Sequence, residues 1–304
     1  MTYSIVARDK KTGEFGVAVQ SHYFQVSPAV PWAQAGVGAV ATQSRVNLSY
    51  GKLGLELLEA GYTAEQALAA LTAGDPLAEA RQCAIVDAAG NVAAHTGARC
   101  IPAAGHTLGD GFSCQANLME KDTVWDAMAE AYTGTDAPLA ERMLAALEAA
   151  EAEGGDIRGK QSAAMVVVAA TGTGRPWNDR IIDLRVEDNA EPLPELRRLL
   201  RIKRAYMTAG EADALEESGD VPGAIAKLHE ALEIAPEMVE LRVMTGVTMA
   251  GAGDLDGGCA LIAEAVRKNA RWVEAIHRFA SVGLVKPEVV AAIEARLAAT
   301  TRPH

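Results

Sequence analysis

Short apolar runs separated by turn-forming residues dominate the first part of the chain. Tyr3–Arg8 and Phe15–Gln20 each have the length and apolar content of a buried strand, and the polar segment 10–14 between them includes Gly13. This arrangement predicts a β-hairpin at the start of the chain. The run Val37–Gln43 predicts a third strand.

Helical periodicity first appears over Leu53–Leu71, where apolar residues recur every three or four positions. Gly61 is a weak point in this segment, and Thr63 is a candidate N-cap because its hydroxyl can accept a hydrogen bond from the first turn of a helix. The same periodicity predicts two more helices, over 123–132 and 139–152.

A second hairpin is predicted from Cys83–Asp87 and Val92–Thr96, which flank the turn-forming segment 88–91. The order of strands, helices, strands, helices and strands favours two packed sheets with helices outside, a layered α/β architecture. Three more strand candidates complete this part of the chain: Phe112–Gln115, Ala163–Ala170 and Ile181–Val186.

Every segment beyond Pro194 has a helical period, and Gly219-Asp220 recurs as Gly253-Asp254 after 34 residues. This is the period of tetratricopeptide repeats, and small residues recur at matching places in both copies. A generic helical bundle is the alternative. We therefore expect two domains, 1–195 and 196–304, the second all-helical and tetratricopeptide-like. The matching positions are Ala224, Leu228, Ala231 and Pro236 in the first copy and Gly258, Ile262, Ala265 and Ala270 in the second.

Composition narrows the class of protein. The 304 residues are 49% hydrophobic and 22% charged, which is typical of a globular chain. The formal net charge of −12 repels phosphate backbones and anionic membranes, so no nucleic-acid partner is expected. The chain has no apolar run long enough for a signal or membrane segment, and a cytoplasmic location with no membrane partner is the expectation.

Cysteine and histidine spacing offers no metal site. The four cysteines contain no C-x-x-C pair, which fits a reducing compartment and predicts no disulfides. No two histidines share a helical face at metal-ligand spacing. We expect neither a metal nor a cofactor.

The amino terminus carries the strongest chemical candidate. Motifs of serine hydrolases, zincins, P-loop proteins and dinucleotide-binding proteins are missing from the sequence. Thr2 is small enough for Met1 to be removed enzymatically, and its free α-amine would then lie beside its own hydroxyl as a general base. The alternative is that Thr2 only begins a strand, and a retained Met1 would convert the amine into an unreactive amide.

A family resemblance supports the first alternative. Three segments, TYSIVARDKKTGEFGVAVQSHYFQVSPAVPWAQAGVGAVATQSRVNLSYGKLGLELLEAG, GFSCQANLM and GGDIRGKQSAA, resemble domain-of-unknown-function family 1028, a group placed among the N-terminal-nucleophile (Ntn) hydrolases. The resemblance covers about the first 200 residues. It implies a four-layer αββα sandwich, amide hydrolysis through an acyl-enzyme on the N-terminal residue, and a homodimer.

The resemblance places the nucleophile at Thr2, with Ser4 as a second choice that lacks a free amine. Proteasome-type members carry an acidic residue at the end of the second strand, where this chain has Gln20 and Ser21. That departure argues against a proteasome-like charge network.

Polar residues after the third predicted strand are candidates for supporting roles. Arg45 would lower the pKa of the nucleophile, and Gln43 or Asn47 would donate to an oxyanion. Gln115 and Asn117, expected just before a helix, could also face a tetrahedral oxyanion. Polar capping of strand ends and of the next helix are the alternatives for these two groups.

The segment before the predicted strand Ala163–Ala170 contains an acid that could hold the threonine amine. Asp156 would set the charge and orientation of that amine, with Arg158 and Ser162 nearby. An ordinary ion pair between Asp156 and Arg158 is the alternative.

The leading hypothesis is an Ntn amidohydrolase that cleaves a small amide or peptide-like substrate. Thr2 attacks, its amine shuttles the proton, amide donors stabilise the oxyanion, and water releases the acyl group. The rival is a binding or scaffold protein that kept the fold but lost turnover, with the helical repeats recruiting a protein partner.

Overall fold

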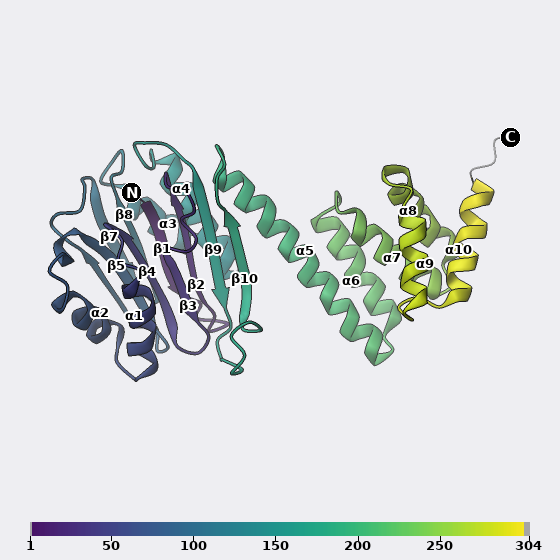
Figure 1. The fold of residues 1–304 in the computed structure, drawn as a ribbon, viewed down its shortest axis with the longest axis horizontal. Helices are drawn as coiled ribbons and strands as arrows, with labels where there is room; N and C mark the ends of the chain where they lie inside the picture. The colour runs from purple at the N-terminus through teal and green to yellow at the C-terminus, as the bar shows by residue number, and fades with distance from the viewer. Residues whose placement is uncertain (1, 301–304) are drawn as a thin grey trace. The chain divides into compact units, whose positions relative to one another are not determined.

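The computed structural model describes residues 2–300 and divides the chain into two compact units, the first ending at Leu200 and the second beginning at Arg201. The boundary falls inside α5 (Pro192–Ser218). The first unit is a mixed α/β domain built on antiparallel sheets, and the second contains only helices (Figure 1). The expected removal of Met1 concerns a residue outside the described part of the chain.

The larger sheet, sheet A, has six antiparallel strands in the order β10-β9-β2-β1-β8-β7. Its strands are β1 (Thr2–Arg8), β2 (Phe15–Ser21), β7 (Ala104–Gly109), β8 (Phe112–Asn117), β9 (Ser162–Val168) and β10 (Arg180–Val186). The predicted opening hairpin is confirmed, and it forms the middle of this sheet. Because β1 lies between β2 and β8, its first residue is surrounded by strand ends.

The smaller sheet, sheet B, has four antiparallel strands in the order β3-β4-β5-β6. They are β3 (Pro31–Gln34), β4 (Gly38–Ser44), β5 (Arg81–Asp87) and β6 (Val92–Thr96). The hairpin predicted from the two runs around 88–91 is confirmed as β5 and β6.

Helices cover the outer face of each sheet, and three apolar clusters separate the layers. Helices α1 (Ser49–Glu59) and α2 (Ala64–Ala73) pack on sheet B, and α3 (Val124–Thr133) and α4 (Leu139–Ala152) pack on sheet A. A third cluster fills the space between the sheets. The first unit is therefore layered as helix, sheet, sheet, helix (Figure 1).

Alternation along β1 assigns its side chains to two different layers. Tyr3 and Ile5 lie in the core beneath α3 and α4, whereas Val6 lies in the core between the sheets. Successive side chains of a strand point to opposite faces, so Thr2 and Ser4 share the inter-sheet face with Val6. Polar residues at the start of β1 are thereby placed inside the sandwich.

The predicted helix over Leu53–Leu71 is divided in two. The N–H groups of Gly61 and Tyr62 donate to the carbonyls of Leu58 and Leu57, a Schellman motif that ends α1, and Gly61 has φ +94°. Thr63 is the N-cap of α2, as predicted: its hydroxyl accepts from the Gln66 N–H, and the Gln66 side chain accepts from the Thr63 N–H.

Two strands were not predicted. β3 begins at Pro31, which cannot donate to a ladder, but an edge strand tolerates proline. β7 contains Gly105, where a Cβ would come within 2.4 Å of the Trp125 ring. Glycine is required there because the indole lies against the backbone, and the glycines hide the strand pattern from the sequence.

The second unit consists of the rest of α5 and five further helices, α6 (Val221–Ile234), α7 (Val239–Gly251), α8 (Leu255–Lys268), α9 (Trp272–Ser281) and α10 (Pro287–Thr300). The repeated Gly-Asp pair forms the same junction twice. Gly219 and Gly253 have φ of +86° and +101° and end α5 and α7 in Schellman motifs.

The aspartates of these pairs begin the next helices in matching ways. Asp220 and Asp254 have φ, ψ of −83°, 69° and −84°, 70°, and their carboxylates accept from the N–H groups of Gly223 and Gly257 at 3.0 and 2.9 Å. The small residues predicted to pack closely are buried in both helices, for example Ala231.

No helix among the described residues is long and apolar enough to cross a membrane.

The loops between strands lie at two opposite ends of the sandwich. The Thr2 end comprises the loops that adjoin the strand ends around Thr2, namely 22–30, 45–48, 97–103, 118–123 and 153–161. The Arg8 end comprises the loops at the opposite strand ends, including 9–14, 88–91, 110–111 and 134–138.

Candidate functional site

Thr2 lies at the end of the central strand β1 and faces the space between the sheets. It is paired across the ladders with Ser21 on β2 and Asn117 on β8. Its hydroxyl Oγ1 donates to Ser21 Oγ at 3.0 Å, and the residue is 5% exposed. The register thus brings together three polar residues that are far apart in the sequence.

Sheet B contributes Gln43 from β4 to the same corner. Its Nε2 donates to the Thr2 carbonyl oxygen at 3.3 Å and to Gln82 Oε1 at 2.7 Å. Gln43 is 1% exposed. This side chain spans the gap between the sheets, so one of the sequence-predicted amides does contact the nucleophile candidate, through its backbone.

Gln82 on β5 is the junction of the network, and sequence reasoning missed it. Its Oε1 accepts from Gln43 and from Asn117 Nδ2, the latter at 2.8 Å. Its Nε2 donates to the carbonyl of Ala116 at 2.8 Å and to Thr96 Oγ1 at 2.9 Å. Gln82 therefore orients both amides that reach the Thr2 carbonyl. Glutamine recurs near the ends of apolar strands in this sequence, and that pattern is the signal that could have identified Gln82.

Ser4 is enclosed by the same network. Its hydroxyl donates to Gln43 Oε1 at 2.6 Å and accepts from Gln115 Nε2 at 2.6 Å, while Gln115 Oε1 accepts from Ser113 at 2.8 Å. Ser4 and Gln115 are completely buried. Both hydrogen-bonding functions of the Ser4 hydroxyl are used, so this residue is poorly placed to act as a second nucleophile.

Asn117 carries an unused acceptor beside Thr2. Its Nδ2 donates to the Thr2 carbonyl at 3.4 Å as well as to Gln82, but its buried Oδ1 has no hydrogen-bond partner in the described chain. Asn117 is the last residue of β8, six residues before Thr123, so it does not cap the following helix. An unpaired buried acceptor is costly and therefore needs an explanation.

Asp156 closes the end of β1. Its backbone forms a bridge with Met119, and its Oδ2 accepts from the His22 N–H at 3.4 Å. His22 directly follows Ser21, and Met119 comes two residues after Asn117, so the carboxylate lies near both strand ends that flank Thr2.

The Asp156 carboxylate is fully buried and forms a bidentate ion pair with Arg158, at 3.0 and 2.7 Å. The ion-pair alternative considered from the sequence is therefore present. Burial, Glu151 and the charge of Asp156 together raise the pKa of the neighbouring Tyr3 hydroxyl. The Tyr3 hydroxyl donates to Glu151 at 2.6 Å on the helix side of sheet A.

Ser162 fixes the loop after β2. Its hydroxyl donates to the Tyr23 carbonyl at 2.6 Å and accepts from the Val26 N–H at 3.2 Å. Because Ser162 pairs with Ser21 in the sheet, strand β2 lies between Ser162 and Thr2. Its contacts support the site wall and do not reach Thr2 itself.

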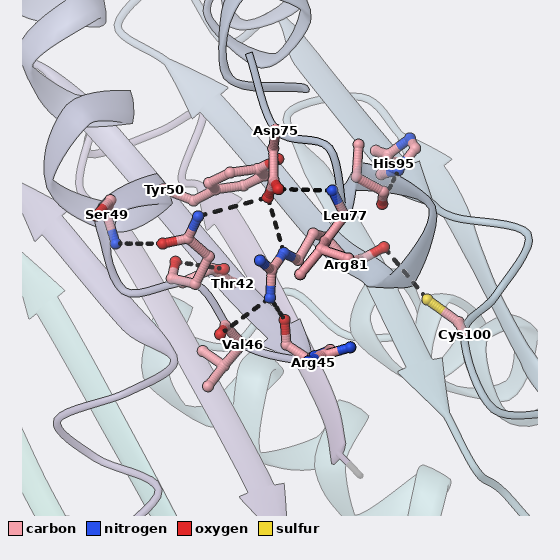
Figure 2. A network of polar contacts seen from close by, with 12 residues as sticks. Thr42, Arg45, Val46, Ser49, Tyr50, Asp75, Leu77, Arg81, His95 and Cys100 are labelled. Carbon is pink, nitrogen blue, oxygen red and sulfur yellow. Dashed lines mark hydrogen bonds and ion pairs between the residues drawn. The ribbon is translucent and has the colours of Figure 1, made fainter. Parts of the chain in front are cut away.

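Arg45 and Asn47 belong to a second network on sheet B (Figure 2). The Arg45 carbonyl accepts from Arg81, and Asn47 Oδ1 accepts from the Ser49 N–H at 3.1 Å at the start of α1. Among the described residues, neither side chain hydrogen-bonds to Thr2. The structure therefore separates these two candidates from the corner formed by Thr2, Gln43 and Asn117.

The second network is centred on a largely buried ion pair between Asp75 and Arg81, with Nε to Oδ2 at 2.8 Å (Figure 2). Hydrogen bonding from Arg81, with help from the Leu77 N–H, lowers the pKa of Asp75. Burial and the adjacent Asp75 raise the pKa of Tyr50, whose hydroxyl donates to Asp75 at 3.1 Å. Since Arg81 and Gln82 are neighbours on β5, this ion pair supports the strand that positions Gln82.

A cavity of about 510 Å³ borders that network, between α1 and α2. Its walls combine Tyr50 and Asp75 with the apolar side chains of Leu53, Leu57 and Leu71. The polar groups at its base hydrogen-bond to one another, so the described residues of this cavity present no unpaired charge to a ligand.

The described residues include no group of three or more His, Cys, Asp or Glu side chains that could hold a metal ion. Nor does any His, Lys or carboxylate of the described chain hydrogen-bond to Thr2 Oγ1. The corner thus presents a hydroxyl and several amides but no side-chain base. General-base chemistry on this hydroxyl would have to come from the main-chain nitrogen of Thr2 itself.

Fold and site together define a class of protein: a layered sandwich of two antiparallel sheets with a polar corner at the head of its first strand. Residues 2–196 match the model of a family of unknown function, DUF1028. The chain belongs to this family.

Among solved structures, the chain is similar to the crystal structure of protein SPO2555 from Silicibacter pomeroyi, which is assigned to the same family. The two are 31% identical, and the alignment covers 66% of this chain and 84% of the other with a TM-score of 0.60. No curated protein matches the chain.

Proposed function

We propose that the first unit is an Ntn-type amidohydrolase whose nucleophile is Thr2 after cleavage of the Met1–Thr2 bond. The α-amine takes the hydroxyl proton as Oγ1 attacks the amide carbonyl, and returns it to the leaving amine. An ester remains on Oγ1, and water hydrolyses it to a carboxylic acid and free Thr2. The substrate class is a small amide or peptide-like molecule.

One observation carries this proposal: the Thr2 hydroxyl is fixed at the head of the central strand in a corner made of hydroxyls and amides. Ser21 Oγ accepts from Thr2 Oγ1 at 3.0 Å, and the Asn117 and Gln43 side chains donate to the Thr2 carbonyl oxygen. Amide N–H donors held close to the nucleophile are suited to a developing oxyanion. We assign Asn117 Nδ2 to that role: the oxyanion would replace its long 3.4 Å hydrogen bond to the Thr2 carbonyl, while the second N–H stays with Gln82.

The groups around the strand end also suit a free amine. The buried Asn117 Oδ1 has no partner in the described chain and is an acceptor for one N–H of the amine. Asp156, buried beside the ends of β2 and β8, supplies negative charge that favours the protonated amine after attack. Arg158 limits that effect by balancing the charge.

The test has two parts, beginning with the amine. Intact-mass measurement of the native protein should show loss of Met1. Reaction with a β-lactone, an acylating trap, should then add one acyl group, which peptide mapping should locate on Thr2. Full retention of Met1 in a protein that still turns over amides would refute the mechanism.

Thr2→Ala should lower turnover of an amide panel by at least about a thousandfold, since the attacking hydroxyl is lost although the α-amine remains. Ser4→Ala is the matched control, because it removes a neighbouring hydroxyl that is already fully bonded, and it should keep most of the activity. If Ser4→Ala abolishes turnover and Thr2→Ala does not, the nucleophile assignment is wrong.

A second candidate function is a binding or scaffold role without turnover. It is favoured by the 5% exposure of Thr2 and by the second unit, in which two helix pairs share one junction geometry. We propose that these pairs are tetratricopeptide-like repeats that recruit a protein partner. Under this second function, deleting the second unit should abolish partner capture, and the full chain should hydrolyse none of the amides in the panel.

A further inference from the structure

Large apolar side chains are concentrated in the loops of the Thr2 end. Six of them are between 39% and 57% exposed. The other exposed large apolar side chains described in residues 2–200 lie elsewhere: Leu53, Tyr62, Leu108 and Trp177. The six at the Thr2 end, called here the apolar rim, are Tyr23, Phe24, Val46, Leu48, Ile101 and Ile157.

One side of the rim is attached directly to the strand beside Thr2. Leu118 follows Asn117, the ladder partner of Thr2. The Leu118 N–H donates to the Ile101 carbonyl at 2.9 Å, and the Ile157 N–H donates to the Leu118 carbonyl at 3.3 Å. Leu118 has φ +59°, a conformation that costs energy for a residue with a side chain and is held by these bonds.

The opposite side of the rim follows β2. Tyr23 and Phe24 come two and three residues after Ser21, which contacts the Thr2 hydroxyl. The hydrogen bonds of Ser162 to the segment 23–26 fix this loop. Apolar groups therefore follow both strands that flank Thr2.

Several charged side chains of these loops are exposed to solvent, among them Arg45, Arg99 and Lys121. Beside Thr2 itself the described side chains are hydroxyls and amides, and Arg158 is bound by Asp156 through two hydrogen bonds. A carboxylate or ammonium brought into this interior would lose hydration without gaining an unpaired opposite charge among the described side chains. An apolar group would instead be removed from water against the rim, which is favourable.

We propose that the apolar rim is the subsite for the acyl side of the substrate, and that the substrates are amides of uncharged, apolar carboxylic acids. This inference rests on the proposed role of Thr2 as nucleophile, because the acyl carbon must reach Oγ1. Ile101 and Ile157 contact the acyl chain from the β8 side, and Tyr23 and Phe24 from the β2 side.

Matched fluorogenic substrates test the proposal on the full chain. The hexanoyl, acetyl and succinyl amides of 7-amino-4-methylcoumarin differ only in the acyl group. The hexanoyl amide should have a kcat/KM at least about tenfold above that of the succinyl amide. Equal values for the two would overturn the subsite.

Single substitutions test which side chains determine the preference for an apolar acyl group. Ile157→Glu should lower kcat/KM for the hexanoyl amide about tenfold or more and change the acetyl amide little. Leu108→Glu is the control, because Leu108 is similarly exposed, at 49%, but lies on β7 toward the Arg8 end. A similar loss in both variants, or a loss for all three amides with Ile157→Glu, would contradict the assignment.

Binding separates this inference from the proposed function. Thr2→Ala should still bind hexanamide in calorimetry, and adding Ile157→Glu should weaken that binding about tenfold. Thr2-dependent turnover without acyl preference removes the subsite only, whereas selective binding without turnover removes the mechanism only. If Ile157→Glu instead dissociates an oligomer in sedimentation velocity, the rim is an interface between copies of the chain and the subsite proposal fails.

Discussion

The polar groups at the two ends of the sandwich are satisfied by different kinds of interaction. At the Thr2 end, hydroxyls and amides from both sheets bond to one another in the interior, and the buried acceptor Asn117 Oδ1 has no partner among the described residues. At the Arg8 end, cations and anions alternate around a cavity of about 410 Å³, among them Arg8, Asp9, Lys10, Asp110 and Arg142.

Asp9 shows how the charged end is satisfied. Its carboxylate accepts from the N–H groups of Lys11 and Thr12 at 2.7 and 2.9 Å and pairs with Arg142. Burial opposes ionisation of Asp9, but the Thr12 and Lys11 N–H groups and then Arg142 outweigh it and lower its pKa. The guanidinium also lies 4.6 Å from the centre of the Tyr132 ring.

Under the proposed function, the Arg8 end serves stability and the Thr2 end serves chemistry. A carboxylate that already has three donors gains from folding but has little left for a ligand. The Thr2 end keeps an acceptor and a hydroxyl that the proposed substrate and free amine would use. The two ends should therefore respond differently to substitution and to pH.

The largest effect on stability is expected from Gln82→Leu at the Thr2 end. The change keeps side-chain volume but leaves the Gln43 and Asn117 amides without their shared acceptor. The free energy of unfolding should fall by about 2–4 kcal/mol, because each buried donor left unpaired costs about 1–3 kcal/mol. Urea unfolding measures this directly.

Gln161→Leu is the matched control for that variant, since among the described residues the Gln161 side chain bonds only to the exposed Asp188. Its unfolding free energy should stay within about 0.5 kcal/mol of the unaltered protein. An effect of Gln82→Leu no larger than the control would mean that the amide network is not a stabilising unit.

A smaller loss is expected from Arg142→Met at the Arg8 end. The apolar stem is kept, but Asp9 loses its cation while retaining two backbone donors, so the cost should be about 2 kcal/mol. Arg180→Met, which breaks the more exposed pair with Asp183, should cost less than about 1 kcal/mol. Comparable losses in both variants would remove the contrast between buried and exposed pairs.

The smallest expected effect is on acid sensitivity. Because folding lowers the pKa of Asp9, its contribution is complete above the unfolded-state pKa of about 3.9 and is lost as the pH falls toward the folded value. Asp9→Asn should therefore lose less stability than the unaltered protein between pH 5 and pH 3 in urea unfolding. Gln82→Leu should keep the unaltered pH dependence, since the Thr2 network does not titrate. Identical slopes for Asp9→Asn and the unaltered protein would contradict this account.

Much of the fold was predictable because it depends on local patterns. Apolar runs bounded by turns correctly predicted the opening hairpin, and helical periodicity gave the bounds of α4 correctly. β3 and β7 were missed because proline at an edge and glycines beneath aromatic rings replace the usual strand residues.

The site was less predictable because it depends on register between distant strands. Thr2, Ser21 and Asn117 meet only when β1 pairs with β2 and β8 at one register, which a single sequence does not specify. Gln82 is 80 positions from Thr2 and belongs to the other sheet. Arg45 and Asn47, although close to Gln43 in sequence, turn away with the chain after β4 and join Asp75 and Arg81.

The Gly-Asp junction of the second unit is local in sequence. Every hydrogen bond that forms it lies between Leu215 and Gly223 in the first copy, and between Met249 and Gly257 in the second. Each junction is thus formed entirely by residues of one short segment of the chain. Insertions or deletions in the second unit outside these two segments should therefore leave both junctions, and the register of the strands around Thr2, unchanged.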